Sequence, residues 1–131
     1  MSSRINFNSG SKWEDRVGYS RVVRVGNHIE VSGTVAADEN GQVVGKNDPY
    51  RQAFYILQKI EKALQQAGAS LNDVVRTRMF VTDITKFDEY GRAHGEFFRH
   101  IKPCTSMLEV KGLVEKEYMI EIEATAILNI E

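Results

Sequence analysis

The sequence has too few cysteines for disulfides and no apolar run long enough to span a membrane. Its 131 residues include one cysteine, Cys104, and neither a CxxC motif nor a clustered Cys/His set is present to hold a structural metal. The first ten residues, MSSRINFNSG, lack the apolar core of a secretory signal. We therefore expect a cytoplasmic protein without a metal site or a membrane partner.

An excess of charge of either sign is also absent. Seventeen basic residues and eighteen acidic residues leave a formal net charge of -1, so there is no overall attraction to a phosphate backbone. This balance disfavours nucleic acid as a partner. With 42% hydrophobic residues and no repeat or linker-like run, the chain is expected to form one domain over residues 1–131.

The first half of the chain predicts a hairpin and a helix. Residues 19–25 and 28–33 are rich in β-branched side chains and flank Gly26-Asn27, a two-residue hairpin signal; a second turn leads into the sequence QVVG. Asp48-Pro49 then supplies an N-cap and a first helical position. Apolar residues follow at spacings of three and four, up to a C-terminal Gly68: Ala53, Leu57, Ile60, Leu64 and Ala67.

The second half predicts a strand in RTRMFVTD, a helix beginning at Thr85 with Asp88 as a capping box, and two final strands, TSMLEV and YMIEIEATAIL. Pro103 ends the second helix. The predicted fold class is α+β, in the order βββαβαββ, with a sheet of about six strands and two helices packed on one face.

Two helices cover only one face of such a sheet, because strands lie roughly 5 Å apart and helices roughly 10 Å apart. The alternation of the last strand places Glu121 and Glu123 on the uncovered face. The preceding strand would place Thr105, Met107 and Glu109 there if Leu108 and Val110 turned toward the helices. Such a mixed face is typical of either a solvated surface or a subunit interface with paired carboxylates, and the pattern leaves both open.

Several segments together resemble the Rid/YjgF family, also called the L-PSP endoribonuclease or imine deaminase family. They run from about Tyr19 to Leu128 in the same order and spacing: YSRVVRVGNHIEVSG, DPYRQ, VVRTRMFVTDITKFDEYGRAHGEFF, KPCTSMLEV and IEIEATA. The resemblance implies a chorismate-mutase-like (YjgF) fold and a homotrimer with small-molecule clefts between subunits. It also implies hydrolysis of enamines or imines such as 2-aminoacrylate to a 2-keto acid and ammonia, without cofactors.

Three positions keep the pattern of the family's cleft. The resemblance implies that Tyr19 lines the cleft, that the backbone N–H of Gly33 faces the ligand, and that Glu121 handles the proton or the attacking water. Burial in a cleft between subunits could tune the pKa of Glu121 for that role. The alternative is a structural carboxylate paired with Arg76, with Arg78 or with a neighbouring subunit.

Three other positions depart from the pattern. Thr105 stands where the deaminases keep an arginine that clamps the substrate carboxylate, and one neutral hydroxyl is a weaker contact than a planar pair of charged donors. Met107 stands in place of a frequent cysteine and Gly91 in place of a frequent asparagine. The sequence therefore predicts a less cationic and more apolar cleft, and a substrate other than 2-aminoacrylate.

Other residues are candidates for the substrate-binding role. Arg21, Arg24 and Arg92 could each replace the missing clamp, and Trp13, near Tyr19 in the sequence, could form an aromatic lip over the cleft. Solvent exposure of the arginines and plain packing of the tryptophan are the alternatives. The three histidines show no metal-ligand spacing.

Three hypotheses for the function follow. The first is a trimeric hydrolase that deaminates an enamine, an imine or a related metabolite, with Glu121 moving protons. The second is a non-catalytic ligand-binding or regulatory trimer, motivated by Thr105 and Met107. The third is an endoribonuclease, which the near-neutral charge disfavours because RNA binding of this kind needs a basic groove.

Overall fold

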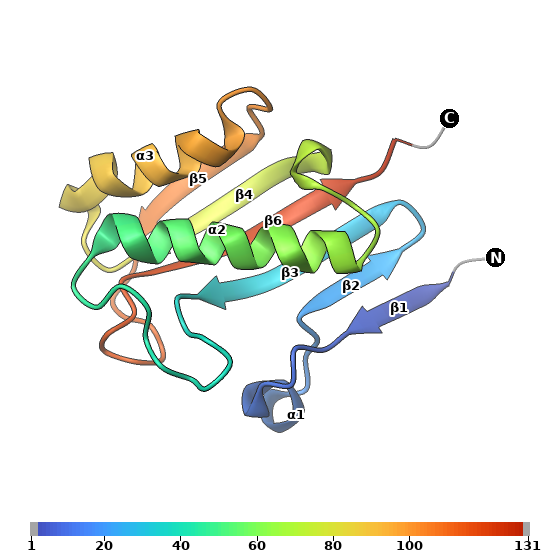
Figure 1. Cartoon of the computed structure of the whole chain (residues 1–131), viewed down its shortest axis with the longest axis horizontal. Helices are drawn as coiled ribbons and strands as arrows, with labels where there is room; N and C mark the ends of the chain where they lie inside the picture. Colours follow the sequence, from blue (N-terminus) through green and yellow to red (C-terminus); the bar gives the residue numbers. More distant parts are fainter. Residues whose placement is uncertain (1–2, 130–131) are drawn as a thin grey trace.

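A mixed sheet of six strands carries two long helices on one face (Figure 1). The computed structural model describes residues 3–129. The sheet order is β1-β2-β3-β6-β4-β5, and neighbouring strands pair antiparallel except β4 and β5, which are parallel. The strands are β1 (Arg4–Phe7), β2 (Val22–Val25), β3 (His28–Val35), β4 (Val74–Val81), β5 (Cys104–Glu109) and β6 (Ile120–Ile127). The helices are α1 (Lys12–Val17), α2 (Pro49–Gln66) and α3 (Phe87–Phe98).

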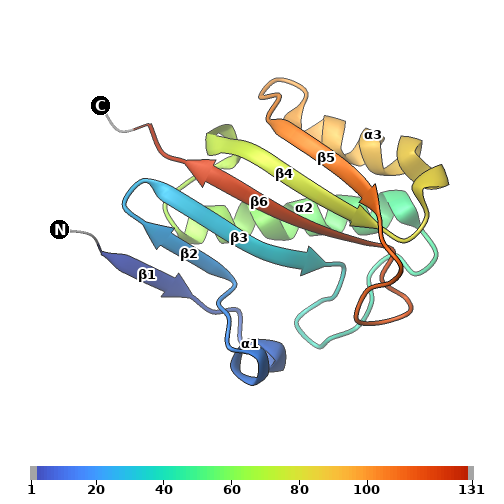
Figure 2. The same cartoon turned by 180° about the vertical axis from the view of Figure 1, so that it is seen from behind.

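The predicted α+β class and the six-stranded mixed sheet are confirmed, with α2 and α3 over the same face, as the view from behind also shows (Figure 2). The observed order has one more element, because the short helix α1 separates β1 from β2. The third strand expected in the first half was not located correctly by the sequence: it is β1, Arg4–Phe7, ahead of the hairpin, and the QVVG segment contributes only an isolated bridge between Ala37 and Val43.

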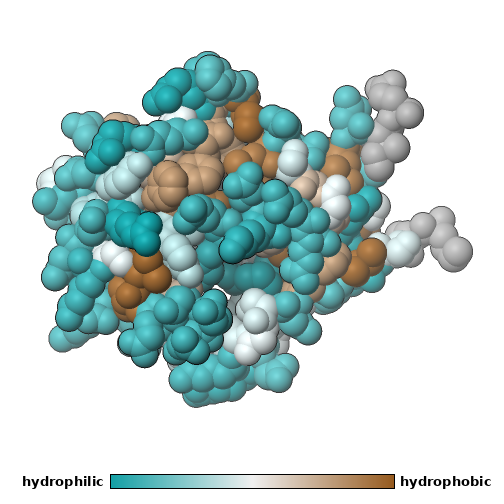
Figure 3. All heavy atoms as spheres, in the orientation of Figure 1, coloured by the Kyte–Doolittle hydropathy of each residue, from teal (hydrophilic) through white to brown (hydrophobic). Residues whose placement is uncertain are grey.

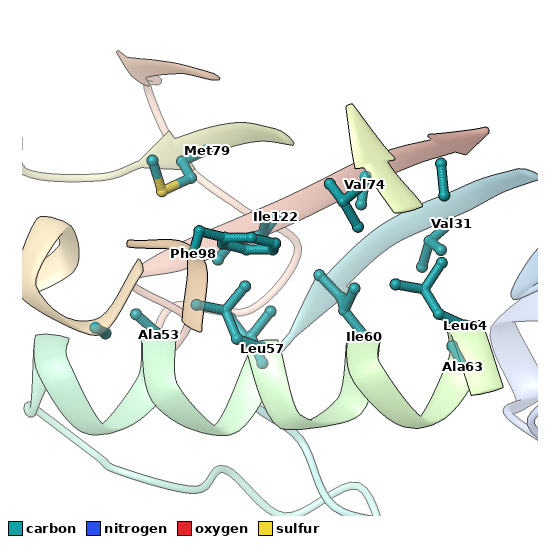
Figure 4. Packing of buried hydrophobic residues seen from close by; sticks show 14 of the residues in the cluster. Val31, Ala53, Leu57, Ile60, Ala63, Leu64, Val74, Met79, Phe98 and Ile122 are labelled. Atoms are coloured by element: carbon teal, nitrogen blue, oxygen red, sulfur yellow. The ribbon is translucent and has the colours of Figure 1, made fainter. Parts of the chain in front are cut away.

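Helix α2 begins and ends where the sequence predicts. The Asp48 side chain accepts a hydrogen bond from the Arg51 backbone N–H at 3.0 Å, Pro49 occupies the first turn, and Gly68 follows the helix with a φ of 88°. Its apolar stripe packs against the sheet, and Figure 4 shows Leu57, Ile60 and Leu64 pointing at side chains from the strands. The core therefore lies between α2, α3 and one face of the sheet.

Helix α3 begins two residues later than predicted. A 3-10 turn over Ile84–Lys86 precedes it, and the Asp83 carboxylate caps that turn by accepting hydrogen bonds from the Thr85 backbone N–H at 3.0 Å and hydroxyl at 2.6 Å. Thr85 is thus a donor inside the turn. The predicted capping box with Asp88 was wrong, because the helix itself starts at Phe87 without a side-chain cap.

The uncovered face carries Glu121 and Glu123, as predicted. Along β6, Ile120, Ile122, Ala124 and Ala126 are buried toward the helices, while the residues between them are half-buried on the other side.

The predicted orientation of β5 was wrong. Register pairs Thr105 with Thr77 and Met107 with Met79, and both β4 residues are buried beneath the helices. Thr105 and Met107 therefore face α3, and Leu108, which is 53% exposed, faces the open side.

The outer side of the helices is mainly hydrophilic, with scattered apolar residues (Figure 3). Within residues 3–129, no helix is long and apolar enough to cross a membrane.

Replacing Gly91 by alanine should stabilise the protein. Gly91 lies inside α3 with an ordinary helical backbone, and an added Cβ would meet no atom within 4 Å. The free energy of unfolding should rise by about 0.5–1 kcal/mol, because alanine has the better helix propensity. Thermal denaturation measures the change. Gly68→Ala is the control and should destabilise the protein, since φ is 88° there; a gain in both variants would contradict the argument.

Candidate functional site

Glu121 lies on the uncovered face of the sheet beside an irregularity in β3. The β3–β6 register shifts between Val31 and Thr34, so three steps along β3 match two along β6. Gly33 falls inside this β-bulge, and a Cβ built on it would lie 2.9 Å from the carboxyl carbon of Glu121. The bulge and the missing side chain together give the Glu121 carboxylate its place against the β3 backbone.

Arg21, the residue immediately before β2, joins the same site. Its guanidinium donates to the Gly33 carbonyl at 2.8 Å and to the Thr34 hydroxyl at 3.2 Å, and it lies 5.8 Å from the centre of the Tyr19 ring. The structure therefore gathers Tyr19, Arg21, Gly33 and Glu121, three of which the sequence had selected as a site and one as a possible clamp.

The carboxylate of Glu121 has an altered acidity. Burial raises its pKa above the ordinary value of 4.5; the positive charge of Arg21 acts in the opposite direction, and the negative charge of Glu123 adds to the rise. No ion pair among residues 3–129 includes Glu121. Arg78 pairs instead with Glu123, at 3.6 Å, and Arg76 donates to the Ser106 hydroxyl at 2.9 Å. Within the described residues, the Glu121 carboxylate is therefore not held in a salt bridge.

Replacing Gly33 by alanine should displace the Glu121 side chain while leaving the protein folded. The added methyl group would occupy the space of the carboxylate, but that group is the end of a flexible side chain and can rotate away. We expect a change in melting temperature of at most a few degrees and a loss of ligand-dependent or catalytic activity of about tenfold or more. Gly112→Ala is the matched control, since nothing lies within 4 Å of an added Cβ there. An equal loss in both variants would contradict this role for Gly33.

Thr105 belongs to a second cluster on the opposite face of the sheet. Its hydroxyl accepts a hydrogen bond from the Thr77 hydroxyl at 2.7 Å, and the same Thr77 oxygen lies 2.8 Å from Nε2 of His94 on α3. A hollow of about 230 Å³ opens between α3 and β5 at this point and is lined by residues that include His94 and Thr105. One subunit therefore cannot bring Thr105 and Glu121 to the same ligand.

The remaining candidates lie apart from Glu121. Met107 packs against the edge of the core. The guanidinium carbon of Arg92 lies 3.9 Å from the centre of the Tyr50 ring. On α1, the guanidinium carbon of Arg16 lies 4.9 Å from the centre of the Trp13 ring. Their binding roles stay predictions. A second hollow, of about 360 Å³, includes Tyr19 in its lining together with polar residues of β1 and α1.

The sequence analysis did not identify His94 or Thr77 as members of a site. His94 had been considered only as a metal ligand, and among the described residues no group of three or more His, Cys, Asp or Glu side chains could hold a metal. The signal for Thr77 is a threonine at a core-facing position of an otherwise apolar strand face. Its partner, however, comes from a parallel strand 28 residues away.

Comparison with known sequences identifies one family over nearly the whole chain. The profile of the Endoribonuclease L-PSP family matches residues 11–128. A RutC family protein of Pyrococcus abyssi is 38% identical over 109 residues, covering 82% of this chain and 84% of the relative. An uncharacterised protein of Streptomyces coelicolor is 32% identical over 118 residues, covering 90% and 87%.

Solved structures agree with this match. Rv2704 of Mycobacterium tuberculosis, described as a member of the YjgF/YER057c/UK114 family, superposes with a TM-score of 0.87 at 44% identity, covering 96% of this chain and all of its own. A putative endoribonuclease of Thermotoga maritima superposes with a TM-score of 0.82 at 28% identity, covering 95% and 92%. Sequence and structure therefore point to the same relatives.

Proposed function

The chain belongs to the Endoribonuclease L-PSP family, also called the Rid/YjgF family, and on that premise we propose that it hydrolyses an enamine or imine to a carbonyl compound and ammonia. The observation that carries the proposal is Glu121: a half-buried carboxylate without an ion pair among the described residues, whose pKa burial raises. A carboxyl group whose pKa is raised holds its proton more readily than an ordinary glutamate, as a general acid and base requires.

The proposed hydrolysis has three steps. Protonation of the enamine carbon gives an imine, the oxygen of a water molecule forms a bond to the C=N carbon, and the carbinolamine then breaks its C–N bond to release ammonia. We assign the proton transfers to Glu121, which donates when neutral and accepts a proton from the water when ionised. Arg21 and Tyr19 lie beside it to orient the substrate.

The cleft is proposed to form between subunits of a homotrimer. Glu121 and Thr105 leave opposite faces of one sheet, so a ligand that touches both needs two copies of the chain. The uncovered face also contains half-buried arginines and carboxylates that a neighbouring subunit could pair, among them Arg76 and Glu123. Light scattering during size-exclusion chromatography should give three times the 14.9 kDa mass of the chain; a monomer would contradict the proposed cleft.

The function itself is tested by ammonia release from freshly generated enamines. One substrate is 2-aminoacrylate, and another is an enamine of similar size without a carboxylate, because the position of the family's clamp is occupied by Thr105. We expect the protein to accelerate hydrolysis of at least one enamine above the uncatalysed rate. Acceleration of neither substrate by the folded trimer would sink the proposal.

A second candidate function is a non-catalytic binding protein, favoured by Thr105 and Met107 in place of the arginine and cysteine that the resemblance leads one to expect. In that case a metabolite bound to the purified protein would survive prolonged incubation unchanged. Mass spectrometry of the ligand before and after incubation separates the two functions, because a hydrolase would consume an enamine or imine.

A further inference from the structure

The hollow between α3 and β5 has the composition of a binding site rather than of a packing defect. Its lining includes the basic side chains of Arg99 and Lys102, the imidazole of His94, the ring of Phe98 and the hydroxyl of Thr105. Thr105 is exposed, so a ligand can reach its hydroxyl from solvent. None of these positions except Thr105 was selected from the sequence.

The hydrogen bonds around Thr105 determine where its hydroxyl proton can point. The Thr77 hydroxyl donates to Thr105 at 2.7 Å, so its single proton is already used. In the tautomer that carries its proton on Nε2, His94 donates to the Thr77 oxygen, 2.8 Å away. The chain of bonds runs from His94 through Thr77 to Thr105, which leaves the Thr105 proton free to point into the hollow.

Burial supports this arrangement at the His94 end. It lowers the pKa of His94 below the ordinary 6.5, which favours the neutral imidazole with its single N–H. In the Nε2 tautomer this N–H is directed at the hydroxyl of Thr77, a fully buried residue. The ring of His94 is further held by Phe98, with ring centres 4.6 Å apart.

Two cations, Arg99 and Lys102, line the same hollow as Thr105. No ion pair within the described residues includes Arg99 or Lys102. Gly95 makes room for the first of them, because a Cβ at this position would lie 3.2 Å from an Arg99 guanidinium nitrogen. A hydroxyl donor flanked by two uncommitted cations is suited to a small anion.

We propose that this hollow binds a carboxylate, with Thr105 donating a hydrogen bond, Arg99 and Lys102 supplying the charge, and His94 and Thr77 acting as positioning residues. A carboxylate suits it because the guanidinium can engage both carboxylate oxygens while the Phe98 ring contacts the carbon skeleton. The inference rests on the proposed function in taking this group to be the acidic end of the substrate. It assigns carboxylate recognition to residues of α3 and the loop after it, in place of an arginine on β5.

The binding experiment uses the full chain and sodium pyruvate as the probe, at constant ionic strength, followed by NMR of the Thr105 methyl group and the His94 ring. Methyl pyruvate, the uncharged ester, and inorganic phosphate are the comparison ligands. We expect saturable shifts with pyruvate and at least tenfold weaker binding of the ester. Absence of shifts, or binding of the ester or of phosphate as tight as that of pyruvate, would overturn the inference.

Variants then separate charge from position. Arg99→Gln and Lys102→Gln should each weaken pyruvate binding about tenfold, whereas Lys62→Gln, on the exposed side of α2, should not. His94→Phe keeps a ring but loses the donor and should weaken binding, while His94→Gln restores an N–H and should recover much of it. Equal behaviour of the two His94 variants would refute the positioning role.

Failure of the proposed carboxylate site can be distinguished from failure of the proposed hydrolase function. Pyruvate binding by NMR needs no turnover, so binding without ammonia release would reject the hydrolase alone. Ammonia release with no effect of Arg99→Gln on the KM of an acidic substrate would reject the carboxylate site alone.

Discussion

Replacing Glu121 by glutamine should lower the rate of ammonia release by about 10²–10⁴-fold, the usual contribution of one positioned acid or base. The substitution keeps the shape of the side chain and its hydrogen-bonding capacity but removes the proton that the carboxyl group gives and takes. Because the site sits on paired strands beside a β-bulge, the geometry around residue 121 should be preserved. Steady-state assays of kcat and KM measure the effect, which is expected in kcat.

Glu123→Gln is the matched control. Glu123 lies two residues away on the same strand and face, but its carboxylate pairs with Arg78 at 3.6 Å. Its loss should leave kcat within about threefold, since a salt bridge that solvent still reaches contributes little. A comparable loss of activity in both variants would assign the effect to the charge of the face rather than to acid–base chemistry at residue 121.

The Glu121→Gln variant should be more stable than the natural protein at neutral pH. Since burial raises the folded-state pKa of Glu121, the folded protein holds this proton more tightly than the unfolded chain. As pH rises above the ordinary value of 4.5, ionisation then favours unfolding, a penalty that glutamine does not carry. Melting temperatures at pH 4 and pH 7.5 should show a gain for Glu121→Gln that appears only at the higher pH.

Gln52→Leu should destabilise the protein by about 3 kcal/mol or more, through three backbone groups left without partners. Gln52 is fully buried on the inner side of α2. Its amide nitrogen donates to the carbonyls of Gly45 at 3.2 Å and Glu117 at 2.9 Å, and its amide oxygen accepts from the Met119 backbone N–H at 2.9 Å. One side chain thus ties the loop before α2 to the loop before β6.

Urea denaturation measures this loss, and Gln58→Leu on the exposed side of the same helix is the control, with an expected change within about 0.5 kcal/mol. Gln52→Leu should lower the urea concentration at the midpoint of unfolding and leave the slope of the transition nearly unchanged. A small effect at Gln52 would mean that water replaces its amide in the three hydrogen bonds.

Local patterns in the sequence were enough to predict the long elements. Helix α2 has a cap, a proline in its first turn and a regular apolar stripe. Strand β6 alternates over eight residues, so the strand alone shows on which face of the sheet Glu121 lies. These signals lie within one segment. No information about a distant partner was needed.

The errors arose where the pattern is short or the partner is distant. Met107 and Leu108 are adjacent apolar residues, so the β5 sequence fits either orientation, and only its parallel register with β4 decides which side faces α3. Helix α1 has six residues between a capping Ser11 and Gly18, too few for a clear period. The link from His94 to Thr105 depends on that same register and on the docking of α3.

Two defective variants of this protein should complement each other. Since Glu121 and Thr105 project from opposite faces of the sheet, each proposed cleft takes one half from each of two neighbouring chains. Glu121→Gln and Arg99→Gln subunits, unfolded together and refolded as a mixture, would form some clefts with both halves intact and others with both altered. Activity in the mixture above that of either variant alone would show that each active cleft combines Glu121 of one chain with Arg99 of a neighbouring chain.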